Sequence, residues 1–82
     1  MTKEHIQKRL IDYIAEKIFS GPASELSPGT DLLANGVLDS VSVLQMVDFV
    51  EAEFAIQFQA HEVDHENFQT VELLSAFLLA RR

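Results

Sequence analysis

The sequence has no cysteine, and its 6 lysines and arginines lie within the first 17 and the last two residues. Without cysteine, disulfide scaffolds, thiolate metal sites and cysteine nucleophiles are all excluded. The 13 acids outnumber these cations and give a formal net charge of −7. Nucleic acids and anionic membrane surfaces are bound through lysine and arginine, so we expect neither as a partner.

The middle of the chain is purely acidic. From Ile18 to Ala80 it has no lysine or arginine but ten aspartates and glutamates. Such a surface suits a partner with a basic patch, although solubility alone also explains it. No apolar run reaches the roughly 18 residues of a membrane span and no signal-peptide pattern opens the chain, so we expect a cytoplasmic protein.

The length of 82 residues allows one small domain, residues 1–82. With 48% hydrophobic residues, the chain is too apolar to be disordered. Met1 and the tail Arg81-Arg82 favour a freestanding protein, and we expect it to be a monomer.

Hydrophobic periodicity predicts an all-α fold, a small four-helix bundle of three main helices and one short helix. The helices are expected at about residues 2–19, 40–54, within 61–67, and at 71–80. Thr2, Asp39 and Thr70 carry side chains suited to cap three of these helices.

A long connection, residues 20–39, joins the first two helices and holds both prolines and all three glycines. A structureless loop of this length is unusual in a compact domain and is often functional. We expect its apolar side chains to fold back onto the core, namely Leu26, Leu32, Leu33, Val37 and Leu38.

The predicted helix 40–54 has two distinct sides on a helical wheel. Its core side is expected to hold Val43, Met46, Val47, Val50 and Phe54. The opposite side carries Val41, Leu44, Gln45, Asp48, Glu51 and Ala52. Two apolar residues on a wet side indicate either a partner contact or ordinary scatter, since single exposed apolar residues are common.

Three patterns in the sequence are typical of catalysis or metal binding, but each lacks residues that its chemistry requires. His61-Glu62-Val63-Asp64-His65 fits the zinc motif H-E-x-x-H, but no third ligand or supporting helix accompanies it, so we expect no metal site. A calcium loop starting at Asp31 fails at two ligand positions. A serine nucleophile at Ser40 has no base nearby in the sequence, so we do not expect an enzyme.

One run of residues resembles a known family. Gly36-Val37-Leu38-Asp39-Ser40-Val41 is similar to the attachment signature of acyl carrier and peptidyl carrier proteins. The similarity extends along residues 30–80, through Asp31-Leu32, the helix end Glu51 to Ile56, and the last-helix start Phe68 to Leu74.

The resemblance implies that Ser40 carries 4′-phosphopantetheine through a phosphodiester, added from coenzyme A by a phosphopantetheinyl transferase. Its thiol carries an acyl or aminoacyl thioester, which is consistent with a chain that has no cysteine of its own. Asp39 is implied to cap the helix and to help the transferase hold its metal and coenzyme A. Val41, Leu44, Asp48 and Glu51 are implied to contact basic loading enzymes and downstream synthase enzymes.

The expected function is therefore that of a non-catalytic carrier protein, and the alternative is an unmodified helical adaptor of the same fold. Ser42 and Gln45 stand where carriers of primary fatty-acid synthesis are usually acidic. This departure favours a secondary-metabolite or otherwise specialised pathway. The sequence leaves the cargo open.

Overall fold

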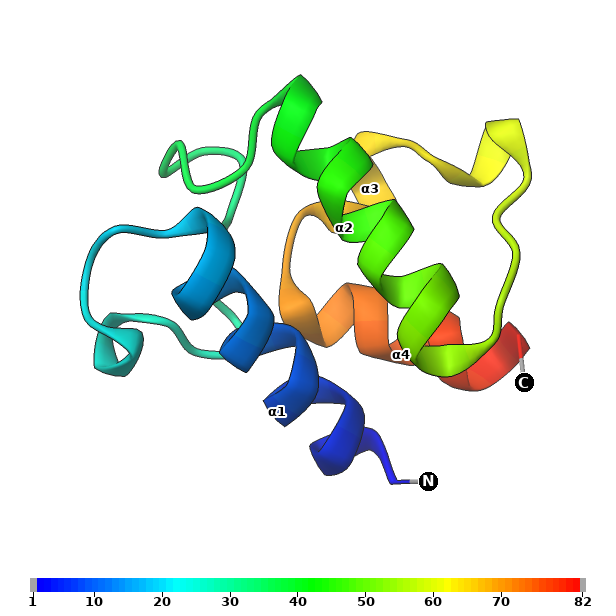
Figure 1. The fold of residues 1–82 in the computed structure, drawn as a ribbon, viewed down its shortest axis with the longest axis horizontal. Helices are drawn as coiled ribbons and strands as arrows, with labels where there is room; N and C mark the ends of the chain where they lie inside the picture. The colour runs from blue at the N-terminus through cyan, green and yellow to red at the C-terminus, as the bar shows by residue number, and fades with distance from the viewer. Residues whose placement is uncertain (1, 82) are drawn as a thin grey trace.

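The computed structural model describes residues 2–81, which form a bundle of helices (Figure 1). In chain order these are α1 Lys3–Tyr13, η1 Ile14–Ile18, η2 Ala23–Glu25, α2 Ser40–Phe54, η3 Ala60–Glu62, α3 His65–Phe68 and α4 Val71–Arg81. Residues 2–81 contain no strand, and the predicted all-α bundle with a long connection between its first two main helices is confirmed.

The first helix begins as predicted, because the Thr2 hydroxyl accepts a hydrogen bond from the His5 N–H at 3.1 Å. Ile6, Leu10 and Ile14 are fully buried. The helix ends in a π turn, η1, closed by the Phe19 N–H donating to the Ile14 carbonyl at 2.6 Å. The sequence did not indicate this wider last turn.

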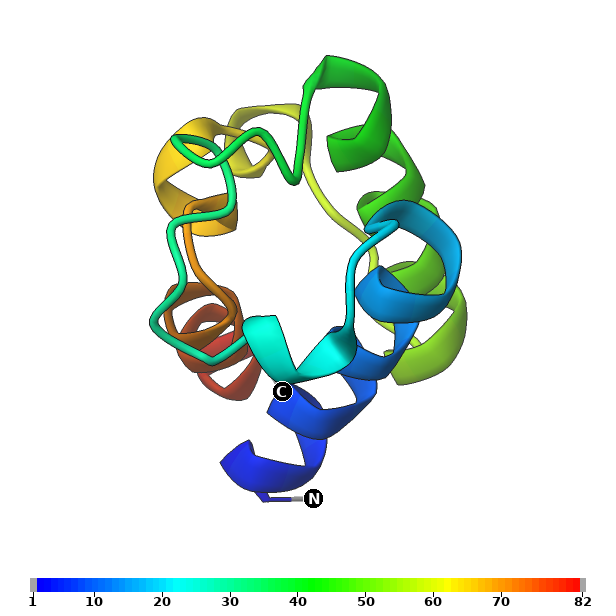
Figure 2. The ribbon, with the colours of Figure 1, turned by 90° about the vertical axis from the view of Figure 1, so that its left-hand side faces the viewer.

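The connection 20–39 is packed as part of the core. Leu26, Leu32 and Leu38 are buried, as predicted, and Leu33 and Val37 pack partly against them. The Leu32 N–H donates to the Gln69 carbonyl at 2.8 Å, which fastens the connection to the segment between α3 and α4. Figure 2 shows the connection 20–39, in cyan to green, on the side of the bundle that faces the viewer.

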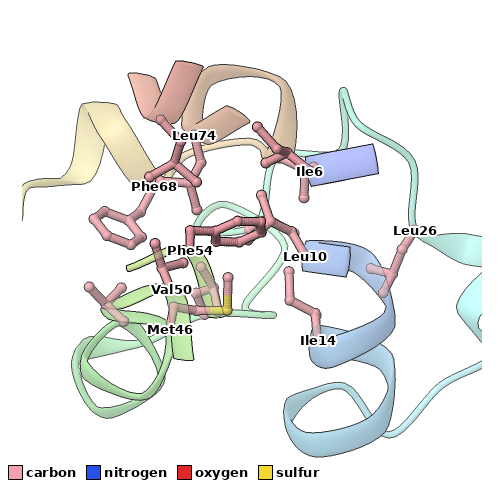
Figure 3. Close-up of a cluster of buried hydrophobic side chains, with 14 residues drawn as sticks. Ile6, Leu10, Ile14, Leu26, Met46, Val50, Phe54, Phe68 and Leu74 are labelled. Carbon is pink, nitrogen blue, oxygen red and sulfur yellow. The ribbon is translucent and has the colours of Figure 1, made fainter. Parts of the chain in front are cut away.

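The core lies where α1, α2 and α4 face one another (Figure 3). On α2, the predicted inner residues Val43, Met46, Val50 and Phe54 are buried, while Val47 is half-buried. Burying a side chain of this size contributes roughly 1.5–3 kcal/mol, so these contacts dominate the stability of the bundle. The fully buried side chains are Ile6, Leu10, Ile14, Leu32, Met46, Val50, Phe68, Val71, Leu74, Ser75 and Leu78.

The chain between α2 and α4 has no regular structure at residues 55–59, then forms η3 and α3. Phe58 stacks on Phe77 of α4, with ring centroids 5.7 Å apart. The Arg81 guanidinium donates to the Glu62 carboxylate and to the Gln57 carbonyl. This bond from Arg81 is the main cause that lowers the pKa of Glu62. The end of α4 thus holds this segment in place.

Ser75 is a buried polar residue that the helical pattern did not reveal. Its hydroxyl donates to the Glu72 carbonyl at 2.9 Å and accepts from Gln7 Nε2 at 3.1 Å. The predicted cap of α4 is also present, because the Leu73 N–H donates to the Thr70 hydroxyl at 3.0 Å. The polar groups in this part of the α1–α4 contact are therefore satisfied.

Ala55 ends α2 in the left-handed conformation, with φ 56° and ψ 43°. This backbone strains a residue that has a Cβ, so we expect Ala55→Gly to raise the free energy of unfolding by up to about 1 kcal/mol. The matched control is Ala52→Gly on the exposed side of α2, which should lower it by about 1 kcal/mol. Urea unfolding of both variants checks the pair, and a destabilised Ala55→Gly protein would contradict it.

Candidate functional site

Ser40 is the first residue of α2, and its side chain is exposed. The preceding Asp39 is extended, and its carboxylate accepts a hydrogen bond from the Ser42 N–H at 2.8 Å. Gly36 reverses the chain just before it with φ 73°, a conformation that favours glycine. The local sequence thus delivers a capped helix with a serine at its first turn.

The carboxylate of Asp39 is held in its ionised form. The Ser42 backbone N–H is the main cause that lowers the pKa of Asp39, and the Ser42 hydroxyl adds to it. A negative cap is also favoured by the positive end of the helix dipole. Asp39 is therefore confirmed as the N-cap of α2, which was its role predicted from the residues alone.

Asp31 also has a structural role in this turn. Its carboxylate accepts from the Ala34 N–H at 2.8 Å and from Gln69 Nε2 at 3.0 Å. The Ala34 bond is the main cause that lowers the pKa of Asp31. The two carboxylate oxygens of Asp31 thus stabilise the conformation of the connection.

A cavity of about 540 Å³ opens beside Ser40. It is bounded by three parts of the chain: the connection, the start of α2, and the segment leading into α3. Its lining residues are Leu33, Leu38, Asp39, Ser40, Val43, Leu44, Val63, Asp64 and His65. The walls are mainly apolar and the polar groups include Ser40, so a flexible group attached to this serine has an apolar space within reach.

Sequence reasoning missed the contribution of Val63, Asp64 and His65 to this cavity. They lie more than 20 residues after Ser40 and reach it only through the packing of α3. The zinc-like motif drew attention to His65, but for a different chemistry. No local signal connects these residues to the start of α2.

The approach of Asp64 and His65 to Ser40 does not create a catalytic triad. The Asp64 carboxylate accepts from the Asn67 N–H at 3.2 Å and caps α3 instead of orienting the histidine. Within residues 2–81, no hydrogen bond joins His65 to Ser40. An activated serine needs a hydrogen bond from the serine to the histidine and a second one from the histidine to the carboxylate.

The H-E-x-x-H motif lacks the helix that its chemistry requires. His61 lies in η3 and His65 begins α3, so the two imidazoles are not on successive turns of one helix. The Glu62 carboxylate between them is held by Arg81 and by the Gln59 N–H at 2.8 Å. In the part of the chain that the structure describes, no group of three or more potential ligands is placed to hold a metal ion.

The outer side of α2 exposes two large apolar side chains, Val41 at 67% and Leu44 at 59%. Gln45, Asp48 and Ala52 are exposed beside them, as the wheel predicted. We call Val41, Leu44 and Asp48 the outer α2 surface. It borders the cavity, because Leu44 contributes to both.

Glu51 differs from the prediction. It is half-buried, and its carboxylate accepts from the Phe58 N–H at 2.9 Å. The segment after α2 brings the Phe58 N–H to this side of the helix, where it binds the carboxylate. The prediction that Glu51 is freely exposed was wrong, because a helical wheel cannot show which other part of the chain packs against the helix.

Charge is unevenly distributed over the molecule. Each lysine and arginine within residues 2–81 lies within 4.0 Å of an acid, in the pairs Lys3–Glu72, Lys8–Asp12, Arg9–Glu53, Lys17–Glu16 and Arg81–Glu62. None of these pairs involves Asp39, Asp48 or Asp64, the acids around Ser40 and Leu44. Acids outside these ion pairs therefore lie around the start of α2.

Residues 2–81 contain no helix that combines the length and apolarity needed to cross a membrane.

Comparison with known proteins finds similarity to one acyl carrier protein. No protein-family model matches the chain. It is 27% identical over 73 residues to the probable acyl carrier protein PigG of Serratia sp. (strain ATCC 39006), covering 89% of this chain and 84% of that protein. This similarity supports an acyl-carrier-like family.

A solved chain has the same fold. It is described as "Crystal structure of FAD-dependent dehydrogenase" and superposes with a TM-score of 0.76 and 28% identity. The alignment covers 84% of this chain and 97% of that chain, so the two are of similar length.

The hydrogen bond of Glu51 gives a prediction about stability. Glu51→Ala leaves the Phe58 N–H without its acceptor, so we expect it to lower the free energy of unfolding by about 1 kcal/mol. Asp48→Ala, one turn earlier on the exposed side, should change it by less than about 0.5 kcal/mol. Thermal unfolding followed by circular dichroism measures both, and equal melting temperatures would refute the structural role of Glu51.

Proposed function

We propose that this protein is a carrier protein that bears 4′-phosphopantetheine on Ser40. The observation that carries the proposal is an exposed serine at the capped start of α2, beside an apolar cavity, in a chain similar to a probable acyl carrier protein. The arm's thiol supplies the thioester chemistry, and the protein presents an acyl or aminoacyl cargo to separate enzymes.

The residues present fit this group. The Ser40 hydroxyl is exposed, and within residues 2–81 it has no hydrogen-bonding partner to displace. A phosphate on it lies at the end of a 15-residue helix, where free N–H groups and the helix dipole favour an anion. Asp39 fixes the first turn and, by resemblance to the family, helps the transferase hold its metal and coenzyme A.

The outer α2 surface is the proposed contact for partner enzymes. Exposed Val41 and Leu44 supply a small apolar centre, while Asp39, Asp48 and Asp64 surround it with negative charge. This arrangement suits a basic rim on a phosphopantetheinyl transferase, a loading enzyme or a downstream synthase. Glu51 is left out of this contact, because its carboxylate is bound to the connector.

The solved chain of the same fold adds one class of enzyme to test. It comes from a structure described as "Crystal structure of FAD-dependent dehydrogenase". An enzyme of this class, acting on the carried thioester, is therefore a suitable partner for the first assays.

The pathway proposed is a specialised one, because Ser42 and Gln45 replace acids that fatty-acid carriers usually have near the attachment serine. We further propose that the protein is a cytoplasmic monomer that performs no catalysis itself. The alternative is an unmodified adaptor that binds partners through the same exposed side of α2, which Val41 and Leu44 would also serve.

Modification of Ser40 is tested by intact mass. Incubation with a promiscuous phosphopantetheinyl transferase and coenzyme A should add about 340 Da, the mass of the arm. Ser40→Ala should add nothing, while Ser42→Ala, one residue beyond Val41 on the same turn, should still be modified. Unmodified wild-type protein, both in this assay and in its native host, would favour the adaptor.

Partner contact is tested with two exposed leucines. Leu44→Asp should reduce the rate of modification at least about tenfold, because it places a charge at the apolar centre of the contact. Leu73→Asp on α4 is the control, since Leu73 is 46% exposed and lies outside the outer α2 surface. Equal rates for the two variants would argue against this surface, and unchanged circular dichroism would show that both remain folded.

A further inference from the structure

His65 lines the same cavity as Ser40, although 25 positions separate them in the sequence. Asp64 places it there by capping α3, so that the first residue of that helix faces the start of α2. His65 is exposed to solvent.

No fixed cation is placed to meet a phosphate on Ser40. The lysines and arginines within residues 2–81 belong to α1, η1 and the end of α4, and each has an acidic partner. The charged residues that line the cavity beside Ser40 are Asp39 and Asp64. His65 is the cavity residue whose side chain is able to carry a positive charge.

We infer that protonated His65 pairs with the phosphodiester of the arm on Ser40 and acts as a positioning residue for that arm. The inference rests on the proposed modification of Ser40. Ser40 and His65 both line the cavity, so binding the phosphate from the α3 side draws the start of the arm toward the apolar walls. The ligand group is a phosphate diester, and the recognising group is an imidazolium.

This pairing couples protonation of His65 to the arm in both directions. If the phosphate favours the charged imidazole, the charged imidazole must favour the phosphate-bound position of the arm by the same factor. Asp39 and Asp64, and Glu66 next to His65 on α3, are present with and without the arm. A comparison of the two forms therefore isolates the effect of the phosphate.

The test follows the three histidine side chains of the full chain by NMR between about pH 5 and 8. The samples are the unmodified protein and the protein whose mass shows that the arm has been attached. We expect the titration midpoint of His65 to rise on modification, with proton affinity increasing about twofold or more at low ionic strength. His61 lies on η3 outside the cavity lining and should change less, and His5 of α1 should not change.

The phosphorus resonance gives an independent readout, since a phosphodiester does not itself titrate in this range. In the modified protein it should shift with the His65 midpoint, and the shift should disappear in His65→Gln but persist in His61→Gln. Raising the salt to about 1 M, where the Debye length is about 3 Å, should reduce the effect.

The outcomes separate the two proposals. If wild-type protein gains no mass, the proposed function fails and this inference fails with it. If the mass is gained but the His65 midpoint stays the same, or the phosphorus shift survives in His65→Gln, carrier function stands and the pairing is refuted.

Discussion

The site depends on the burial of the connection between α1 and α2. Leu26, Leu32 and Leu38 bury their side chains in the core, and the Leu32 N–H is bound to the Gln69 carbonyl. A free chain of this length would leave the start of α2 without a fixed position and would cost conformational entropy to order. Because it is anchored, Ser40 has a defined place opposite α3, and the cavity has a third wall.

Much of the fold follows from local rules, and the parts that do not are those set by tertiary contacts. The bounds of α2 were predicted because Asp39 caps its first turn and the apolar period runs to Phe54. The left-handed conformation at position 55 was not predicted, because this position holds alanine and not the glycine or asparagine that usually indicates it. Glu51 was misplaced and His65 was missed for the same reason: a distant segment packs against each position.

The distribution of charge is organised by pairing as well as by composition. A net charge of −7 spread evenly would only keep the protein in solution. In this structure, α1 and the end of α4 pair their cations with neighbouring acids, while Asp39, Asp48 and Asp64 stay outside these pairs. Asp39 and Asp64 line the cavity together with Leu44, and Asp48 lies one turn beyond Leu44 on α2, which gives a basic partner both a direction of approach and an apolar contact.

The first turn of α2 differs from those of α1 and α4 in a way that suits a phosphate. Glu4 and Glu72 lie in the first turns of α1 and α4, where an acid is favoured by the helix dipole. The first turn of α2 contains no acid after its cap. The sequence thus leaves the positive end of this helix available for the charge that modification would bring, and the acid that does lie there, Asp39, is turned toward the Ser42 N–H as the cap.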